Sequence, residues 1–237
     1  IGGDCPPDCD CPPNCICPPN CTTPEEKLLE MYLYAEYAKR DISEHVSTLR
    51  MYASRVQHVT EVGVQWGLST WGLMQGLYDA ASAAVPKVYR AYDIVVFPYE
   101  AKARALAAAV NIDYNFEQRS ILATDLEDTD LLFLDTFHSY PQLRAELHLH
   151  ARRARRYILL HDTTVDENVS ECVRMAHVWG DDACDQFAME LGFSAEEIRI
   201  GLWPAVQEFL AARPDWHLVR RFTHNNGLTV LERRWPY

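Results

Sequence analysis

Short apolar runs alternate with helical patterns along this chain, and the alternation limits the folds that it can adopt. Strands are predicted at Val56 to Val64, Val88 to Ile94, Leu131 to Asp135, Tyr157 to Leu160, His217 to Phe222 and Leu228 to Arg233. Apolar residues recur at helical spacing in residues 22–35, 42–54, 69–84, 99–110, 141–155 and 203–212. Strands that alternate with helices favour an α/β fold, in which a parallel sheet carries helices on both faces. The sequence Asn225-Asn226-Gly227 is typical of a tight turn and predicts a C-terminal antiparallel hairpin.

Polar residues stand where several of the predicted strands end. These are Glu61 to Ser69, Asp93, Asp135, and His161 with Asp162. Right-handed crossovers bring the carboxyl ends of parallel strands to one edge of a sheet, where ligands commonly bind. We therefore expect a functional site at this edge.

The turn after the first strand has the pattern E-x-G-x-x-x-G-x-S from Glu61 to Ser69, followed by Thr70. Glycines such as Gly63 and Gly67 allow a tight turn, and free N–H groups at the next helix start favour a carboxylate or phosphate. The pattern is not the G-x-G-x-x-G of a dinucleotide-binding turn. The simpler alternative is an ordinary strand-to-helix turn without a ligand.

The ends of two later strands carry groups suited to cation binding and proton transfer. Asp135 and Asp162 offer hard oxygen ligands for a divalent cation, and His138 lies three residues after the first of them. An imidazole titrates near neutral pH, so His138 is our candidate general base. The alternative is that Asp162 caps a turn and that His138 is an ordinary loop residue.

Several motifs in a fixed order resemble a known enzyme family. The sequence D-L-L-F-L-D-x-x-H-S-Y at 130–140 and Y-I-L-L-H-D-T at 157–163, after the turn at 61–70, are similar to class I S-adenosylmethionine-dependent methyltransferases. The resemblance is to the cephalosporin-hydroxylase-like and macrolide-sugar O-methyltransferase group. It runs from about Arg40 to Glu232 and includes Asp41 to His45, Gly201 to Pro204 and Asn225 to Val230. It implies a Rossmann-like three-layer sandwich with a mostly parallel seven-stranded sheet and the C-terminal antiparallel hairpin.

The resemblance also implies roles for individual residues. The cofactor would be S-adenosylmethionine, bound by Glu61, Gly63, Gly67, Ser69, Thr70, Asp93, Thr124, Asp125 and Asp135. Among these, Asp93 would accept hydrogen bonds from the ribose hydroxyls and Asp125 one from the adenine amine. The catalytic residues would be His138, Asp135 and Asp162, and a magnesium or manganese ion would bind Asp135 and Asp162. Metal-dependent members of the family often have a further carboxylate or amide ligand beside the acid at this strand end. Here the neighbours of Asp162 are His161 and Thr163, so the chain departs from that pattern.

Six of the eight cysteines lie in a Cys-Pro-Pro repeat at 1–21. Its alternating C-x3-C and C-x-C spacing does not match the usual zinc patterns, and paired prolines favour an extended chain. We predict a tether at 1–21 and a methyltransferase domain at 22–237, within which residues 164–201 form a variable lid or substrate segment. Because the first residue is Ile1, we expect the chain to be processed or part of something longer.

The net charge of −12 argues against a nucleic-acid partner, and the absence of a long apolar run argues against a membrane span. The body contains only Cys172 and Cys184, as expected for a reducing compartment, so we predict a cytoplasmic protein. The predicted tether ahead of a methyltransferase domain also resembles chlorovirus-type proteins, in which glycosyltransferase domains precede a methyltransferase. This resemblance implies a virus-encoded protein in the cytoplasm of the host.

The expected activity is O-methylation of a hydroxyl, on a sugar or glycan such as a deoxysugar. One alternative is a small-molecule O-methyltransferase acting on a natural product or a phenol. A nicotinamide-dependent oxidoreductase is a second alternative, against which the missing G-x-G-x-x-G counts. A third is a non-catalytic surface module displayed by the tether.

Overall fold

The computed structural model describes residues 22–81 and 85–234, so the predicted tether lies outside the described residues. A seven-stranded sheet forms the centre, in the order β3-β2-β1-β4-β5-β7-β6. The strands are β1 His58–Val62, β2 Lys87–Asp93, β3 Ile112–Gln118, β4 Thr129–Leu134, β5 Ala154–His161, β6 Trp216–Phe222 and β7 Leu228–Arg233. The first five are parallel, and β7 pairs antiparallel with both β5 and β6. The predicted α/β fold, with its C-terminal antiparallel hairpin, is confirmed.

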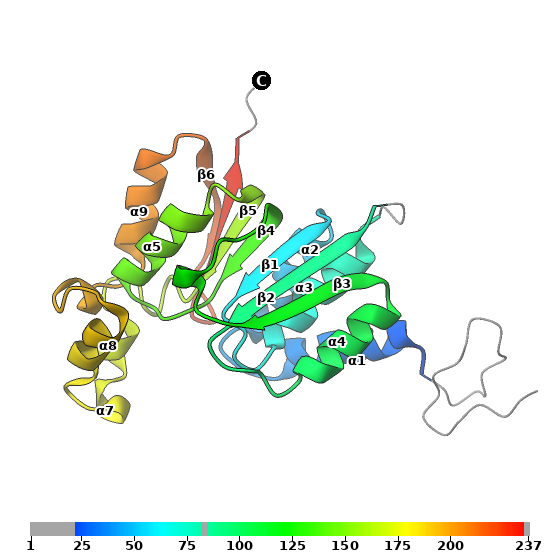
Figure 1. Ribbon diagram of the computed structural model, residues 1–237, viewed down its shortest axis with the longest axis horizontal. Coiled ribbons are helices and arrows are strands. Elements are labelled where there is room, and N and C mark those ends of the chain that lie inside the picture. Colours follow the sequence, from blue (N-terminus) through cyan, green and yellow to red (C-terminus); the bar gives the residue numbers. More distant parts are fainter. Residues whose placement is uncertain (1–21, 82–84, 235–237) are drawn as a thin grey trace, which may run out of the picture.

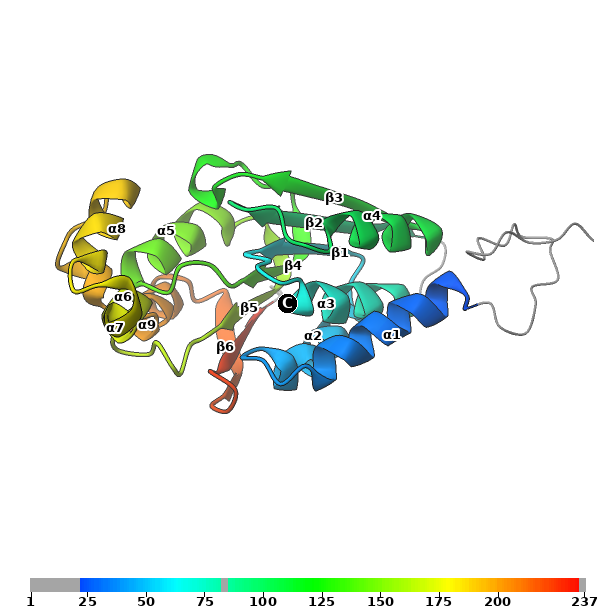
Figure 2. The same ribbon diagram turned by 90° about the horizontal axis from the view of Figure 1, so that it is seen from below.

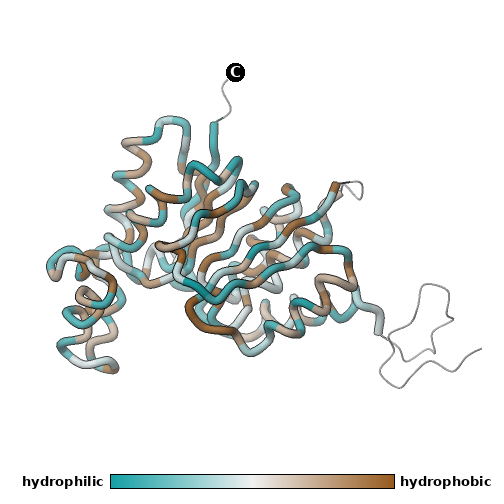
Figure 3. Tube along the Cα trace, in the orientation of Figure 1, coloured by the Kyte–Doolittle hydropathy of each residue, from teal (hydrophilic) through white to brown (hydrophobic). Residues whose placement is uncertain are grey.

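Helices cover both faces of the sheet (Figures 1 and 2). The longer ones are α1 Pro24–Tyr37, α2 Val46–Ala53, α3 Leu68–Asp79, α4 Glu100–Ala109, α5 Tyr140–His150 and α9 Trp203–Ala212. In β4, Leu131 and Phe133 belong to the apolar core shared with α1 to α4, whereas Leu132 and Leu134 belong to the core shared with α5 and α9. This strand is apolar on both faces because both faces are covered, and Figure 3 shows hydrophobic segments along the central strands.

One strand was missed by the sequence analysis. Strand β3 places Ile112, Tyr114 and Phe116 on one face, but Asp113 and the polar residues after Phe116 interrupt its apolar character. It is an edge strand that pairs only with β2 among the described strands, and beyond its buried Ile112 and Tyr114 its side chains are partly or fully exposed. Helix α3 was predicted too long, since it ends at Asp79 instead of Ala84.

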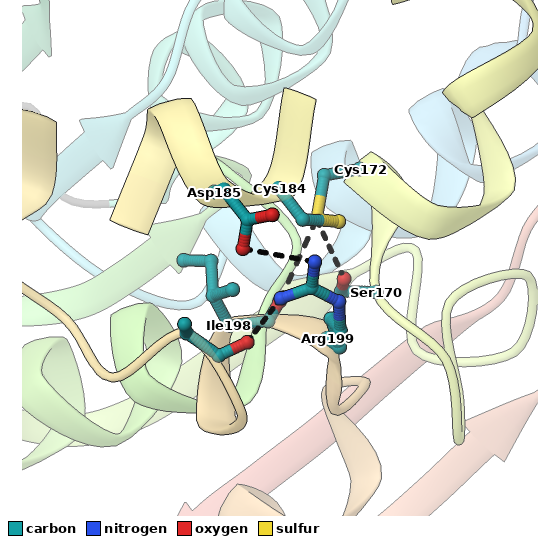
Figure 4. The surroundings of a disulfide bond; sticks show 7 residues. Ser170, Cys172, Cys184, Asp185, Ile198 and Arg199 are labelled. Carbon is teal, nitrogen blue, oxygen red and sulfur yellow. Dashed lines mark hydrogen bonds and ion pairs between the residues drawn. A yellow bond between two sulfur atoms is a disulfide. The ribbon is translucent and has the colours of Figure 1, made fainter. Parts of the chain in front are cut away.

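Residues 164–201 form a small lobe with its own core beside α5 (Figure 1). It contains α6 Glu171–Arg174, α7 Ala176–Trp179 and α8 Ala183–Leu191. A disulfide joins Cys172 in α6 to Cys184 in α8, and both cysteines are buried (Figure 4). Cys172 Sγ also lies 3.7 Å from the carbonyl oxygen of Ile198. A paired disulfide departs from our expectation of a reducing compartment, where protein thiols stay unpaired.

Within the described ranges, no helix combines the length and the apolar character needed to cross a membrane.

Candidate active site

The turn between β1 and α3 is shaped by residues with positive φ. Gly63 has a φ of +83° and Gly67 a φ of +76°, and Gln65 between them is also left-handed at +48°. A Cβ on Gly63 would lie 1.9 Å from the carbonyl oxygen of Asp135, and one on Gly67 would lie 2.9 Å from the ring of Phe97. Both glycines therefore allow close packing against the protein itself, as well as the turn.

Glu61 lies behind this turn and is fully buried at the end of β1. Its carboxylate accepts hydrogen bonds from Ser69 Oγ at 2.5 Å, Thr70 Oγ1 at 2.7 Å and the Tyr89 hydroxyl at 2.7 Å. Burial raises the Glu61 pKa to about 7, although these hydroxyl donors act in the opposite direction. The three side chains predicted to bind cofactor here, Glu61, Ser69 and Thr70, thus bond to one another and fasten β1 to α3.

Asp93 ends β2 and holds the same turn from the other side. Its Oδ2 accepts from the backbone N–H groups of Val64 at 2.7 Å and Gln65 at 2.9 Å, and its Oδ1 accepts from Val95 N–H at 3.0 Å. The carboxylate is half-buried, so it borders the turn without being enclosed by it. Asp93 therefore positions the turn and still presents a carboxylate edge to the site.

His138 lies in a ring of four carboxylates. Its Nε2 is 3.3 Å from Asp135 Oδ1 and 3.0 Å from Asp162 Oδ2, and its Nδ1 is 3.1 Å from Asp166 Oδ2 and 3.4 Å from Glu171 Oε2. Burial alone would lower the His138 pKa, but the negative charges, Asp162 foremost, raise it well above its ordinary value. The imidazole is accordingly held in its protonated form at neutral pH.

A second histidine, His161, joins the same acids. Its Nδ1 lies 3.3 Å from Asp135 Oδ1 and 3.2 Å from Asp162 Oδ2, and its Nε2 lies 3.1 Å from the backbone oxygen of Asp41. Burial disfavours the charged ring, but the carboxylates of Asp135 and Asp162 outweigh this and raise the His161 pKa to about 10. Asp162 is buried with a φ of +56°, a backbone strain of the kind often found at functional sites.

The turn of the C-terminal hairpin holds the segment that contains Asp41. Asn225 Nδ2 donates to the Arg40 carbonyl at 3.0 Å, and Asn225 Oδ1 accepts from Glu44 N–H at 3.0 Å. The carbonyl of Asn226 accepts from the N–H groups of residues 164 and 165, which lie just beyond Asp162. This turn, which we call the clamp (Asn225 to Gly227), thereby holds the Asp41 segment and the residues after Asp162, both of which lie next to His161.

The structure brings Asp135, His138 and Asp162 together, as predicted, and adds three residues that the sequence analysis did not select. Asp166 follows Asp162 by one helical turn, and its N–H bonds the Asp162 carbonyl at 3.1 Å. Glu171 comes from the predicted lid segment, and its N–H donates to the His138 carbonyl at 3.0 Å. The position of Asp166, four residues after Asp162, could have indicated that it belongs to the site. Glu171 and Asp41 reach the site only through the fold.

Asp125 lies away from this site, which corrects its predicted contact with adenine, whereas Thr124 Oγ1 donates to the Ser120 carbonyl at 2.8 Å, close to the carboxyl end of β3. Arg153 Nη2 donates to both carboxylate oxygens of Asp125 at 2.9 Å. Because Arg153 immediately precedes β5, Asp125 lies at the opposite edge of the sheet. The residues that leave the carboxyl end of β3 are instead 119–121, and Arg119 N–H donates to the Asp93 carbonyl at 2.8 Å. The error arose because β3 was not recognised, so the end of that strand could not be located.

Comparison with known proteins bears on the fold. No family model matches this sequence, and no curated protein matches it. The structure is similar to cofactor-bound Rv0187 from MTB, with a TM-score of 0.53 and 16% identity over 89% of this chain and 91% of that chain. The chain has a methyltransferase fold.

Two further solved structures share this fold. The O-methyltransferase TomG from Streptomyces achromogenes, in complex with SAM, gives a TM-score of 0.51 and 15% identity over 90% of this chain and 91% of that chain. The O-methyltransferase from Bacillus cereus, in complex with SAH, gives a TM-score of 0.50 and 15% identity over 89% of this chain and 90% of that chain. In each case the similarity covers about nine-tenths of this chain.

Proposed function

We propose that this protein is an S-adenosylmethionine-dependent O-methyltransferase. The observation that carries the proposal is the convergence of His138, Asp135 and Asp162 at the carboxyl edge of this sheet. The SAM- and SAH-bound structures with the same fold support the choice of cofactor. The acceptor is a hydroxyl group, since proton removal is what a histidine among carboxylates can supply.

The residues around the turn are chemically suited to the cofactor. The first N–H groups of α3, from Leu68 to Thr70, precede the first intrahelical bond and can receive a carboxylate. The half-buried Asp93 carboxylate can accept from two vicinal hydroxyls. When bound, S-adenosylmethionine supplies an electrophilic methyl group, and Glu61 supports the turn from behind.

The donor set also fits a divalent cation. Asp162 Oδ1 is buried and has no hydrogen-bond partner among the described residues, although its other oxygen contacts both histidines. An unpaired buried carboxylate oxygen is costly unless a cation or a water approaches it. Asp135 and Asp162 would hold magnesium or manganese, which would acidify an acceptor hydroxyl bound beside it.

His138 would receive the acceptor proton. It can do so only after the charge of its four carboxylate neighbours has been offset, because they now hold it protonated. Positive charge from the sulfonium and from a cation would act in that direction. Asp135 and Asp162 then orient the ring and stabilise it once it has gained the proton.

The acceptor would bind between this edge and the lobe at 164–201. Phe137, next to His138, packs against Phe187 with ring centroids 4.8 Å apart, and Phe187 packs against Trp179 at 5.6 Å. An aromatic column of this kind can take the apolar face of a sugar or a phenol ring. We favour a sugar or glycan; a natural-product acceptor is the alternative, supported by TomG, which is involved in tomaymycin synthesis.

Two experiments test this proposal. Calorimetry measures the binding of S-adenosylhomocysteine, and an activity assay follows methyl transfer from labelled S-adenosylmethionine to a panel of methyl glycosides and catechols. His138→Ala should lower turnover by about 10²- to 10⁴-fold and leave S-adenosylhomocysteine affinity nearly unchanged. His148→Ala, on the exposed face of α5, is the matched control and should retain activity. Failure to bind S-adenosylhomocysteine at millimolar concentration would favour a non-catalytic module instead, and full activity of His138→Ala would remove His138 as the base.

A further inference from the structure

Asp166 is a buried carboxylate that lies between two cationic side chains. It is fully buried, although it carries a negative charge. Arg174 Nε donates to Asp166 Oδ1 at 2.6 Å and Arg174 Nη2 donates to Oδ2 at 2.9 Å, so the guanidinium engages both oxygens. Oδ2 also lies 3.1 Å from His138 Nδ1. A charge so far from solvent is costly to bury, and these two partners offset that cost.

The backbone of Asp166 is fixed as firmly as its side chain. Its N–H donates to the Asp162 carbonyl at 3.1 Å, and its own carbonyl accepts from the Leu202 N–H at 2.8 Å. Gly201 packs so closely that a Cβ at this position would collide with the Asp166 carbonyl oxygen. The carboxylate therefore has little freedom to follow the imidazole if the ring moves, and it holds the ring in one place.

Asp166 contacts the side of the His138 ring that faces away from the acids at the strand ends. Nδ1 faces Asp166, whereas Nε2 lies 3.0 Å from Asp162 Oδ2. An imidazole turned over about its Cβ–Cγ bond would place carbon atoms where both nitrogens now lie, and it would lose both ion pairs. Glu171 lies farther from Nδ1, at 3.4 Å, and its carboxylate is partly exposed. Asp166 is thus the residue of the lobe that fixes the direction of Nε2.

We propose that Asp166, held by Arg174, is a positioning residue that keeps His138 Nε2 directed at the acceptor hydroxyl. Asp166 is too deeply buried to touch the acceptor itself, and Arg174 binds both of its oxygens, so it acts only through the ring. A carboxylate that orients a histidine base in this way is a recurrent arrangement in enzymes. The inference rests on the proposed function for the role of His138 as base, but the contact between Asp166 and the ring can be measured without an acceptor.

Nuclear magnetic resonance of the histidine rings in the full-length protein tests this contact directly. Long-range ¹H–¹⁵N spectra report each ring nitrogen, and the His138 signals are those missing from His138→Gln. Asp166→Asn keeps the shape of the side chain and removes its charge, so it should shift the His138 Nδ1 resonance. Asp185→Asn is the matched control, because Asp185 pairs with Arg199 at 2.9 Å in the same lobe, and it should leave that resonance in place. An Nδ1 signal that Asp166→Asn does not move would overturn the inference.

Methyl transfer from labelled S-adenosylmethionine then separates positioning from a structural role. Asp166→Asn should lower kcat by about 10²-fold, the loss expected for a base displaced by about 1 Å, and leave the KM for S-adenosylmethionine nearly unchanged. Arg174→Lys, which keeps the charge, should lose less than Arg174→Met. In a His138→Ala background, Asp166→Asn should cause no further loss, because Asp166 acts only through the ring.

A further loss in that background would overturn the inference, since it would show that Asp166 acts independently of His138. Binding of S-adenosylhomocysteine, measured for each variant, confirms that the protein is folded. Absence of that binding in the wild-type protein would count against the proposed function, and the Nδ1 resonance would still decide whether Asp166 holds the ring.

Discussion

Replacing Glu61 with Gln should change how the stability of this protein depends on pH. The side chain is fully buried, and burial raises its pKa from 4.5 to about 7 in the folded state. In the unfolded chain the carboxyl group returns to its ordinary value. The folded state therefore binds the Glu61 proton more tightly, and this contribution to stability is complete below pH 4.5 and lost as the pH rises through 7.

The size of the effect follows from the two pKa values. A difference between 4.5 and about 7 corresponds to about 3 kcal/mol of stability, lost between those pH values. The glutamine side chain of the Glu61→Gln variant cannot ionise, but its amide can still bond the three hydroxyls that surround the position. The free energy of unfolding of Glu61→Gln relative to wild type should thus rise by about 3 kcal/mol between about pH 4.5 and 8.

Urea denaturation monitored by tryptophan fluorescence, repeated across this pH range, measures the difference directly. Trp71 is fully buried in α3 and reports on the same region. Glu190→Gln, at an exposed position of α8, is the control and should follow the wild-type curve. Parallel curves for wild type and Glu61→Gln would refute the reasoning, because they would mean that Glu61 has the same pKa in the folded and unfolded states.

Three further changes should give equally definite results. Gly63→Ala should destabilise the protein by more than about 2 kcal/mol in urea denaturation, because the new Cβ would collide with the Asp135 carbonyl. Asn225→Ala should cost about 1–3 kcal/mol through the loss of two bonds of the clamp, and increased amide hydrogen exchange in the Asp41 segment should reveal it. Cys184→Ala should cost about 3 kcal/mol at most, and limited proteolysis should show earlier cleavage within 164–201; unchanged cleavage would contradict a stabilising role for the disulfide with Cys172.

The parallel core of this fold could be predicted because its signals are local. Strands β4 and β5 are apolar on both faces, and each is followed by an acid or histidine that marks the functional edge. The helix α9 and the strand β7 were predicted with the observed boundaries, Trp203–Ala212 and Leu228–Arg233. In these segments the periodicity of the side chains agrees with their burial in the structure.

The edge strand and the adenine region could not be predicted in the same way. Strand β3 has solvent on one side, so polar residues replace part of its apolar pattern and weaken the signal. Without that strand, the resemblance assigns the adenine contact to Asp125, in the loop before the strand predicted at 131–135. Its actual partner is Arg153, which a sequence pattern cannot reveal because 28 positions separate the two.

The chemistry of the site depends most on contacts of this long-range kind. The sequence placed His161 at a strand end but could not reveal its contacts, because its partner Asp41 lies 120 positions earlier and the clamp residue Asn225 lies 185 positions after Arg40. The strand end supplies the histidine, and the clamp fixes which of its nitrogens faces the acids.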